Sequence, residues 1–302
     1  RHFTHRDENP FSLGNDMVKT VLADREGNIW VGGINGGLGL YNPSKGIFYN
    51  YQYEPGNATS LSQRTVSSLF EDNQGNLWIG THRGGVNEYM PGKEKFKVYR
   101  QELSGSSLSY SDVKGFCEDE GGNIWIGTDG GGLDYFIRDK KIFKHYVHDP
   151  FNPYSIGSDA VLDIMKDREG NIWVGTWGGG LNLFDKKTGR FKQFLHNPAD
   201  PHSISSNYVQ KTFEDYQGNL WVATYYGGLN IYDRRKNSFS RMVDDPSHKT
   251  RLYGNNIVSI MEDRDANIWI GTDDGGLNCY NQTSRSFTHY FDNEEKIPDL
   301  RV

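Results

Sequence analysis

One stretch of sequence recurs six times along this chain and limits its possible folds more than any other feature. In its fourth copy the stretch reads DREGNIWVGTWGGGLNLFD from Asp167 to Asp185: an acidic turn, a Trp-centred apolar run, a glycine cluster and a second apolar run. Such a strict period is typical of a repeat architecture, in which each repeat forms one supersecondary unit. The central tryptophans, 47 or 48 residues apart, are Trp30, Trp78, Trp125, Trp173, Trp221 and Trp269.

The composition of the chain favours strands over helices. Glycine makes up 36 of the 302 residues and aromatic residues make up 14%, which suits many short strands joined by tight turns. The formal net charge of −6 offers no basic surface for a phosphate backbone, so we expect no nucleic-acid partner. No apolar run approaches the roughly 20 residues that a membrane-spanning helix needs.

Each repeat is predicted to contain four short strands. In the fourth copy the first strand starts at Val161, the second is IWVGT, the third is GLNLFD and the fourth is FKQF. Four antiparallel strands in a unit of this length match one blade of a β-propeller. The alternative, a linear β-solenoid, usually repeats over a shorter length. We therefore predict an all-β propeller of four-stranded antiparallel blades, whose native ring has six or seven blades.

The turn between the first two strands has a fixed chemistry. In the fourth copy Asp167 can accept hydrogen bonds from the turn backbone, and Gly170 can adopt a positive φ at little cost. Only the sixth copy replaces this glycine, with Ala266. One or two carboxylates per turn supply too few oxygen ligands for calcium, so we expect no metal site there.

The repeats predict a single propeller domain over residues 1–302, which we expect to be an excerpt of a longer array. One repeat position carries a small side chain except in two adjacent blades, where it carries Asp163 and Lys211. These two residues are predicted to form an ion pair. Cys117 and Cys279 lie three repeats apart and are interpreted as small buried hydrophobic residues. The predicted blades are residues 17–51, 65–99, 112–146, 160–194, 208–242 and 256–291.

The repeats resemble a known family. They fit the pattern D-x-x-G-N-[IL]-W-[IV]-G-T-x-x-G-G-L-N-x-[YF]-[DN], followed by F-x-x-Y and P-x-S-L-x-x-N-x-V, of the two-component regulator propeller repeats. All six copies match, with departures at Gly33, Glu88, Ala223 and Ala266.

The resemblance implies the periplasmic sensor of a hybrid two-component histidine kinase, beside a second propeller and an immunoglobulin-like domain. Many such receptors control carbohydrate use in gut anaerobes. None of the downstream parts occurs in this sequence, so the resemblance assigns it no kinase activity.

The sequence offers no catalytic constellation. It contains no G-x-S-x-G, H-E-x-x-H or G-x-x-x-x-G-K-[ST] motif. His145 and His148 are close in sequence, but a solvated strand end is the simpler interpretation than a metal site. Streptogramin lyases are an enzyme precedent for similar propellers, yet no repeat carries a distinct His and Glu pattern of that kind. We predict no catalytic residues and no cofactor.

Two residues per repeat differ in every copy, between the Thr that ends the second strand and the glycines that open the third. Function in a repeated scaffold falls to positions that break the symmetry, because the shared positions are committed to packing and turns. Aromatic, charged and amide groups at these loop tips have the composition of a sugar or peptide site; alternatively, the tips vary because nothing constrains them. The candidate ligand-binding residues are His82, Arg83, Asp129, Trp177, Tyr225, Tyr226, Asp273 and Asp274.

We therefore expect a non-enzymatic, extracytoplasmic sensor that binds an oligosaccharide or another small ligand. A second hypothesis is a structural module that binds another protein or forms a homodimer. A third is a propeller lyase.

Overall fold

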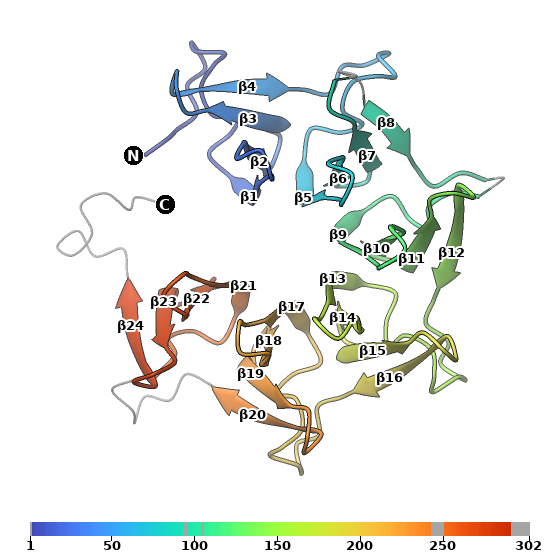
Figure 1. Cartoon of the computed structure of the whole chain (residues 1–302), viewed down its shortest axis with the longest axis vertical. Helices are drawn as coiled ribbons and strands as arrows, with labels where there is room; N and C mark the ends of the chain where they lie inside the picture. Colours follow the sequence, from blue (N-terminus) through green and yellow to red (C-terminus); the bar gives the residue numbers. More distant parts are fainter. Residues whose placement is uncertain (1, 93–95, 104–105, 243–250, 291–302) are drawn as a thin grey trace. The chain divides into compact units, whose positions relative to one another are not determined.

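The chain folds into β-strands joined by loops. The computed structural model describes residues 2–92, 96–103, 106–242 and 251–290. Its strands form six four-stranded antiparallel sheets, in each of which strands consecutive in the chain are neighbours (Figure 1). The predicted all-β propeller fold, with one blade per sequence repeat, is confirmed. Residue 291, the predicted end of the sixth blade, lies outside the described residues.

The six blades divide into two compact units, residues 1–147 and residues 148–302. Unit 1 contains blades 1 to 3, built from β1 (Val18–Ala23), β2 (Ile29–Gly33), β3 (Leu38–Asn42), β4 (Ile47–Tyr51), β5 (Val66–Glu71), β6 (Leu77–Thr81), β7 (Gly85–Tyr89), β8 (Phe96–Tyr99), β9 (Val113–Glu118), β10 (Ile124–Thr128), β11 (Gly132–Ile137) and β12 (Ile142–Tyr146).

Unit 2 contains blades 4 to 6, built from β13 (Val161–Lys166), β14 (Ile172–Thr176), β15 (Leu181–Asp185), β16 (Arg190–Phe194), β17 (Val209–Glu214), β18 (Leu220–Thr224), β19 (Gly228–Asp233), β20 (Ser238–Met242), β21 (Ile257–Glu262), β22 (Asn267–Thr272), β23 (Gly276–Asn281) and β24 (Ser286–Tyr290).

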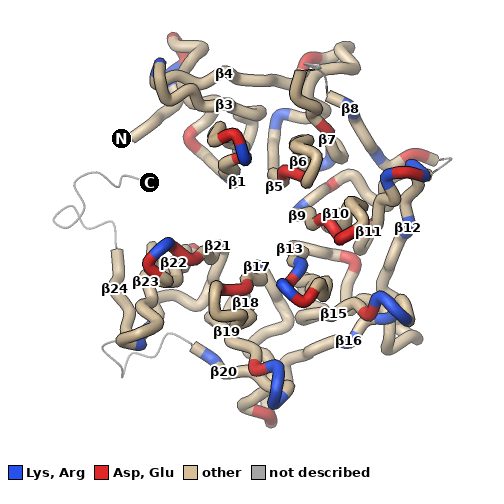
Figure 2. The backbone as a smooth tube through the Cα atoms, viewed as in Figure 1, with Lys and Arg blue, Asp and Glu red and all other residues tan. Residues whose placement is uncertain are grey.

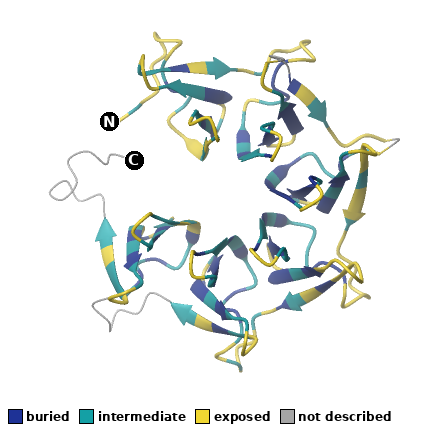
Figure 3. Ribbon diagram, in the orientation of Figure 1, coloured by how far each residue is buried: buried dark blue, intermediate teal, exposed yellow. Residues whose placement is uncertain are grey.

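The core of each unit lies between neighbouring blades. In blade 4, Trp173 on β14 pairs across the sheet with Met165 and Leu183 and is almost fully buried. Together with Phe194 it packs against Tyr232 of blade 5. The second strands of blades 2 to 5 are buried throughout, whereas the fourth strands carry exposed residues (Figure 3).

An aspartate organises the turn between the first and second strands of each blade, which we call the acidic turn. It is buried in blades 2, 4 and 5 and partly buried in the others. In blade 4, Asp167 Oδ1 accepts the backbone N–H groups of Glu169 and Asn171, at 3.1 and 2.8 Å. Its Oδ2 accepts the Asn171 amide at 2.9 Å and the indole N–H of Trp173 at 2.8 Å. Acidic residues recur at this place in every blade (Figure 2). The acidic turns are Asp24–Asn28, Asp72–Asn76, Asp119–Asn123, Asp167–Asn171, Asp215–Asn219 and Asp263–Asn267.

The indole bond is repeated with small variation. In blade 3 the Tyr135 hydroxyl donates to Asp119 Oδ2 at 2.6 Å. In the other blades of both units the Trp donates to the aspartate at 2.7–2.8 Å: Trp30 to Asp24, Trp78 to Asp72, Trp221 to Asp215 and Trp269 to Asp263. One carboxylate thus joins the turn to the central tryptophan in five blades, and in blade 3 it joins the turn to Tyr135, whose ring contacts that of Trp125.

The structure confirms the predicted ion pair between blades 4 and 5 and the predicted burial of Cys117, and it confirms the predicted burial of Cys279 in part. Lys211 Nζ lies 2.7 Å from Asp163 Oδ1, so the predicted ion pair between adjacent blades forms. The backbone and hydroxyl of Thr212 also donate to Asp163, which explains a carboxylate in a column of small residues. Cys117 is buried as predicted, but Cys279 is only partly buried.

The acidic turns generate a prediction about backbone strain. Gly170 has the predicted positive φ, 82°, and Ala266 is held at a φ of 60° in the equivalent place. Left-handed backbone costs a residue with a Cβ free energy that glycine avoids. We expect Ala266→Gly to raise the free energy of unfolding by about 0.5–1 kcal/mol, measured by denaturant titration.

The reverse substitution in blade 5 is the matched control. Gly218 has a φ of 86°, and nothing within 4 Å would meet an added Cβ, so Gly218→Ala reports the backbone effect alone. It should destabilise the chain. Equal stability of Ala266→Gly and the parent chain would contradict the strain assigned to Ala266.

The same turns predict how stability depends on pH. Burial alone would raise the pKa of Asp167, but the hydrogen bonds from Trp173, Asn171 and Arg234 lower it below the ordinary 3.8. In blade 6, hydrogen bonds from Trp269 and Asn267 lower the pKa of Asp263 to about 2. A carboxylate with a depressed native pKa stabilises the fold above the unfolded pKa, and this contribution is lost as the pH falls through the native value.

We therefore expect the melting temperature to be nearly constant above about pH 5 and to fall steeply between about pH 4 and pH 2. Circular dichroism melts across this range provide the measurement. A melting temperature that does not change on acidification would show that the turn aspartates do not stabilise the native state.

Candidate functional site

The loop tips lie directly beside the starts of the first strands. In blade 4 the N–H of Trp177 donates to the carbonyl of Ala160, and in blade 5 the N–H of Tyr225 donates to the carbonyl of Tyr208. The N–H of Gly178 reaches the carbonyl of Asn207 in the linker to blade 5. Each tip is therefore held by its own blade, and the tip of blade 4 is also held by the linker to the next, which brings side chains of neighbouring blades together.

The backbone of the tips turns sharply and displays its side chains. The hydroxyl of Thr176 donates to the carbonyl of Gly180 at 2.8 Å and closes the loop of blade 4. The second tip residue has a positive φ of 58° at Arg83 and 66° at Tyr226. Both of these side chains are exposed.

In unit 1 the structure joins two predicted site residues in a polar cluster, formed by His82, Asp112, Lys114 and Asp129. His82 Nδ1 lies 2.9 Å from Asp112 Oδ2. Lys114 Nζ lies 3.3 Å from Asp112 Oδ1 and 3.3 Å from Asp129 Oδ2. The Asp112 side chain is only 8% exposed, so the cluster is anchored at its centre and open at its ends. Arg83 is the exposed neighbour of His82.

In unit 2 the structure joins three predicted site residues in an aromatic cluster, formed by Trp177, Tyr208, Tyr225 and Tyr226. The Trp177 ring lies 4.6 Å from Tyr208 and 5.6 Å from Tyr225, centroid to centroid. Tyr225 and Tyr226 meet edge to face at 4.2 Å. Trp177 is 42% exposed and Tyr226 67%, so the cluster presents aromatic faces to solvent.

Acidic groups flank the aromatic cluster. The side-chain oxygen of Asn256 accepts a hydrogen bond from the backbone N–H of Tyr226 at 2.9 Å. The backbone N–H of Asn256 donates to Asp274 at 3.3 Å. Asp273 and Asp274 are both exposed. The Tyr226 hydroxyl raises the pKa of Tyr225, and the charges of Asp273 and Asp274 add to this effect. Aromatic faces and carboxylate acceptors are thereby combined on one exposed surface.

Three members of the two clusters, Tyr208, Asp112 and Lys114, were absent from the predicted set of site residues. Tyr208 and Asp112 occupy the same repeat position, immediately before the first strand of blades 5 and 3. Comparison of that position with the tips would have identified both. Lys114 lies in β9 itself and carries no comparable signal, because lysine on a strand is ordinarily solvated.

The described residues contain no group of three or more His, Cys, Asp and Glu side chains arranged to hold a metal ion. Over the same part of the chain, no helix has the length and hydropathy to cross a membrane. His145, which the sequence suggested lies at a solvated strand end with His148, has its Nδ1 2.6 Å from the buried carboxylate of Asp134.

Comparison with known families identifies the repeats. The profile of the family described as "Two component regulator propeller" matches six segments, each of which ends at the second tip residue of its blade. No curated protein matches the sequence. The six segments are residues 12–35, 60–83, 107–130, 155–178, 203–226 and 254–274.

Solved structures with a similar fold include receptor extracellular domains and a lyase. The extracellular domain assigned to the hybrid two component system BT3049 from B. thetaiotaomicron superposes with a TM-score of 0.75 at 22% identity, covering 92% of this chain and 36% of that one. The extracellular domain assigned to the one component system BT4673 from the same organism gives 0.61 at 23% identity, covering 97% and 39%.

Streptogramin B lyase gives a TM-score of 0.66 at 16% identity, covering 98% of this chain and 87% of that one. At such identities these likenesses establish the fold alone. The chain spans little more than a third of the two extracellular domains.

The two kinds of tryptophan in blade 4 should differ in their effect on stability. Trp173 is 1% exposed and binds Asp167, so we expect Trp173→Ala to cost about 3–5 kcal/mol of unfolding free energy. Trp177 is on the surface, and Trp177→Ala should cost less than about 1 kcal/mol. Denaturant titration of both variants provides the test; a comparable loss from Trp177→Ala would assign that residue to the core.

Proposed function

The chain belongs to the two-component regulator propeller family, and on that premise we propose that it is an extracytoplasmic sensor module. In this role it binds a ligand in the periplasm and passes the bound state to a histidine kinase elsewhere in the same receptor. The six family repeats and the likeness to receptor extracellular domains support this role. Its partners would be the neighbouring propeller and immunoglobulin-like domains, and the module itself would be non-enzymatic.

The proposed ligand is an oligosaccharide, and the aromatic cluster is the observation that carries this choice. Sugar rings present C–H faces that pack on flat aromatic rings, while their hydroxyl groups need acceptors and donors at the edge. Trp177 and Tyr226 supply the exposed rings. Asp274 is linked to Tyr226 through Asn256, and together with Asp273 it acts on Tyr225, so both carboxylates can supply acceptors at this cluster.

The polar cluster of unit 1 suits a different contact. Its His82, Lys114 and Asp129 side chains reach solvent while Asp112 holds them in place. Such a cluster can donate and accept hydrogen bonds but offers no apolar face. We assign it a lesser role in sugar recognition than the aromatic cluster.

A protein partner is the second candidate, and the same exposed rings favour it. Tyr and Trp are enriched at the centres of protein interfaces, and a homodimer through this surface would cover Trp177 and Tyr226. The two candidates differ in what the rings contact, so one pair of variants can separate them.

We expect the chain to bind one class of oligosaccharide in isothermal titration calorimetry against a panel of plant and host glycans. The double variant Trp177→Ala, Tyr226→Ala should lose that binding, since it removes both exposed faces. The control is Phe151→Ala, which removes an aromatic side chain that is 94% exposed and lies outside the cluster.

Light scattering after size exclusion accompanies the titrations. A parent chain that binds no glycan, but forms dimers that the double variant disrupts, would replace the oligosaccharide proposal with the protein-partner proposal. Glycan binding that survives in the double variant would exclude the aromatic cluster as the sugar site.

A further inference from the structure

An arginine at one repeat position bridges neighbouring blades in two places. Arg234 follows β19 of blade 5, and its guanidinium lies 2.8 Å from Asp167 Oδ2 of blade 4 and 2.8 Å from Glu214 Oε1 of its own blade. It also lies over the Trp173 ring, 5.9 Å from the ring centroid. The guanidinium thus contacts a turn aspartate, a core tryptophan and the glutamate that ends a first strand.

Blades 2 and 3 contain the same arrangement. Arg138 follows β11 and donates to Asp72 Oδ2 at 2.8 Å, with its guanidinium 5.6 Å from the centroid of Trp78. Glu118 Oε1 lies 3.7 Å from the same guanidinium. Two independent pairs of blades therefore bind a guanidinium group with the same three residue types.

Between blades 1 and 2 the acceptors are present, but the arginine is replaced by Pro91. The Trp30 indole donates to Asp24 at 2.8 Å, as in the other pairs. Glu71 Oε2 accepts the backbone N–H of Arg25 at 2.9 Å, just as Glu214 Oε2 accepts that of Arg168 at 2.7 Å. Proline has no side chain that could reach these groups.

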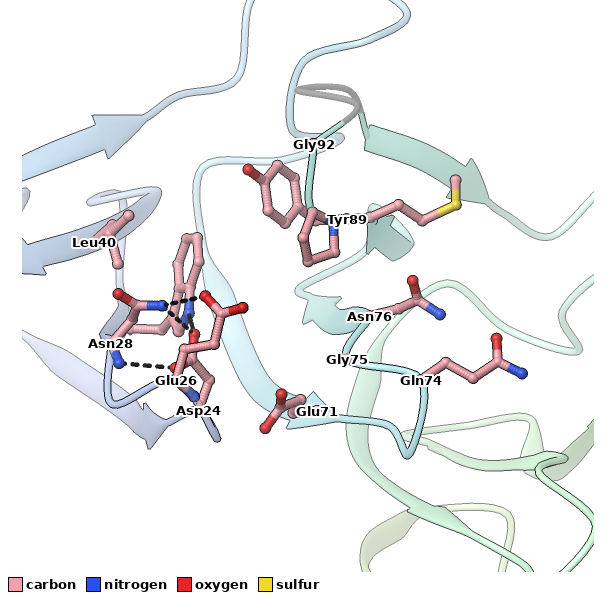
Figure 4. Close-up of a pocket in the computed structure, with 13 residues that line it drawn as sticks. Asp24, Glu26, Asn28, Leu40, Glu71, Gln74, Gly75, Asn76, Tyr89 and Gly92 are labelled. Carbon is pink, nitrogen blue, oxygen red and sulfur yellow. Dashed lines mark hydrogen bonds between the residues drawn. The ribbon is translucent and has the colours of Figure 1, made fainter.

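A cavity of about 480 Å³ occupies this place, and all its lining residues belong to blades 1 and 2 (Figure 4). Asp24, Glu26 and Trp30 line it from blade 1, and Glu71 and Tyr89 from blade 2. Among the described residues that line the cavity there is no Lys, Arg or His. Three carboxylates therefore face the cavity, and no described residue of its wall supplies a cation.

The charges in this cavity are those that the filled sites use. Burial alone would raise the pKa of Asp24, but hydrogen bonds from Trp30 and Asn28 lower it, so the carboxylate is ionised at neutral pH. Glu26 occupies the repeat position of Glu169, whose Oε2 lies 3.8 Å from Arg234 Nη1 in the filled site of unit 2. The fourth group of that filled site is therefore also reproduced.

We propose that the cavity between blades 1 and 2 is a binding site for a guanidinium group from outside this chain. A planar guanidinium can donate to Asp24 and Glu71 together while it stacks on Trp30, which a compact ammonium group cannot do equally well. The site lies at the end of the strands of blades 1 and 2 that is opposite to their loop tips, and it shares no residue with the proposed sugar site. The guanidinium can come from a free small molecule or from an arginine side chain of another protein.

The test is calorimetric titration of the chain with agmatine, which represents a free guanidinium compound, and with N-acetyl-arginine amide, which represents an arginine side chain. N-acetyl-citrulline amide, the neutral match of the second probe, should not bind. Tighter binding of agmatine would identify a free compound as the source, and tighter binding of the arginine amide would identify a protein side chain. Failure of both guanidinium probes to bind would overturn the proposal.

Pro91→Arg is the decisive variant, because it supplies the side chain that Arg138 and Arg234 supply in the filled sites. It should abolish binding of both probes and raise the melting temperature. Glu26→Gln, at an exposed position, should weaken binding a few-fold without affecting the fold. The matched control is Asp265→Asn, the same turn position in blade 6, which should leave binding unchanged. Undiminished binding in a folded Pro91→Arg variant and in Glu26→Gln would also overturn the proposal.

Discussion

The carboxylate of the turn aspartate is the group on which each blade depends. It receives two backbone N–H groups of the turn, an asparagine amide and, in five of the blades, the indole of the central tryptophan. A buried carboxylate is costly unless such donors surround it. Since one donor belongs to the core and the others to the turn, the turn cannot change shape without disturbing the packing between blades.

The same end of the strands also connects neighbouring blades. The glutamate that ends a first strand accepts a turn N–H from the preceding blade, as in the pairs of Glu118 with Asn73 and Glu262 with Tyr216. Where an arginine is present, it adds charge-assisted bonds to this junction. The glutamate and, where it is present, the arginine are thereby bonded across the junction at this end, whereas the loop tips at the other end vary from blade to blade.

The repeated part of this structure could be predicted from the sequence, because each shared residue acts on near neighbours. Asp167 binds its own turn and the tryptophan six residues later, so the pattern within one repeat contains the whole interaction. The ion pair of Asp163 and Lys211 was also predictable, since both break the same column in adjacent repeats. The contacts of Lys114 and Arg138 were not predictable in this way. Those of Lys114 join different repeat positions within blade 3, and those of Arg138 join different repeat positions of blades 2 and 3. Comparing equivalent positions of the six repeats reveals unusual residues, but it does not show which repeat positions lie close together in space.

The two ends of the blades depart from the common pattern in opposite ways. At the loop tips, side chains are added: Trp177, Tyr225 and Tyr226 are large residues at positions where the repeat pattern specifies no residue type. Between the acidic turns of blades 1 and 2 a side chain is missing: Pro91 stands where two other blades carry an arginine, and the acceptors remain. An added aromatic surface is weakly selective until hydrogen bonds at its edge orient the ligand. A junction between blades that lacks its cation is selective without further groups, because its acceptors are already arranged for one planar group. A repeat protein can therefore acquire a specific site by losing a single side chain from its own framework.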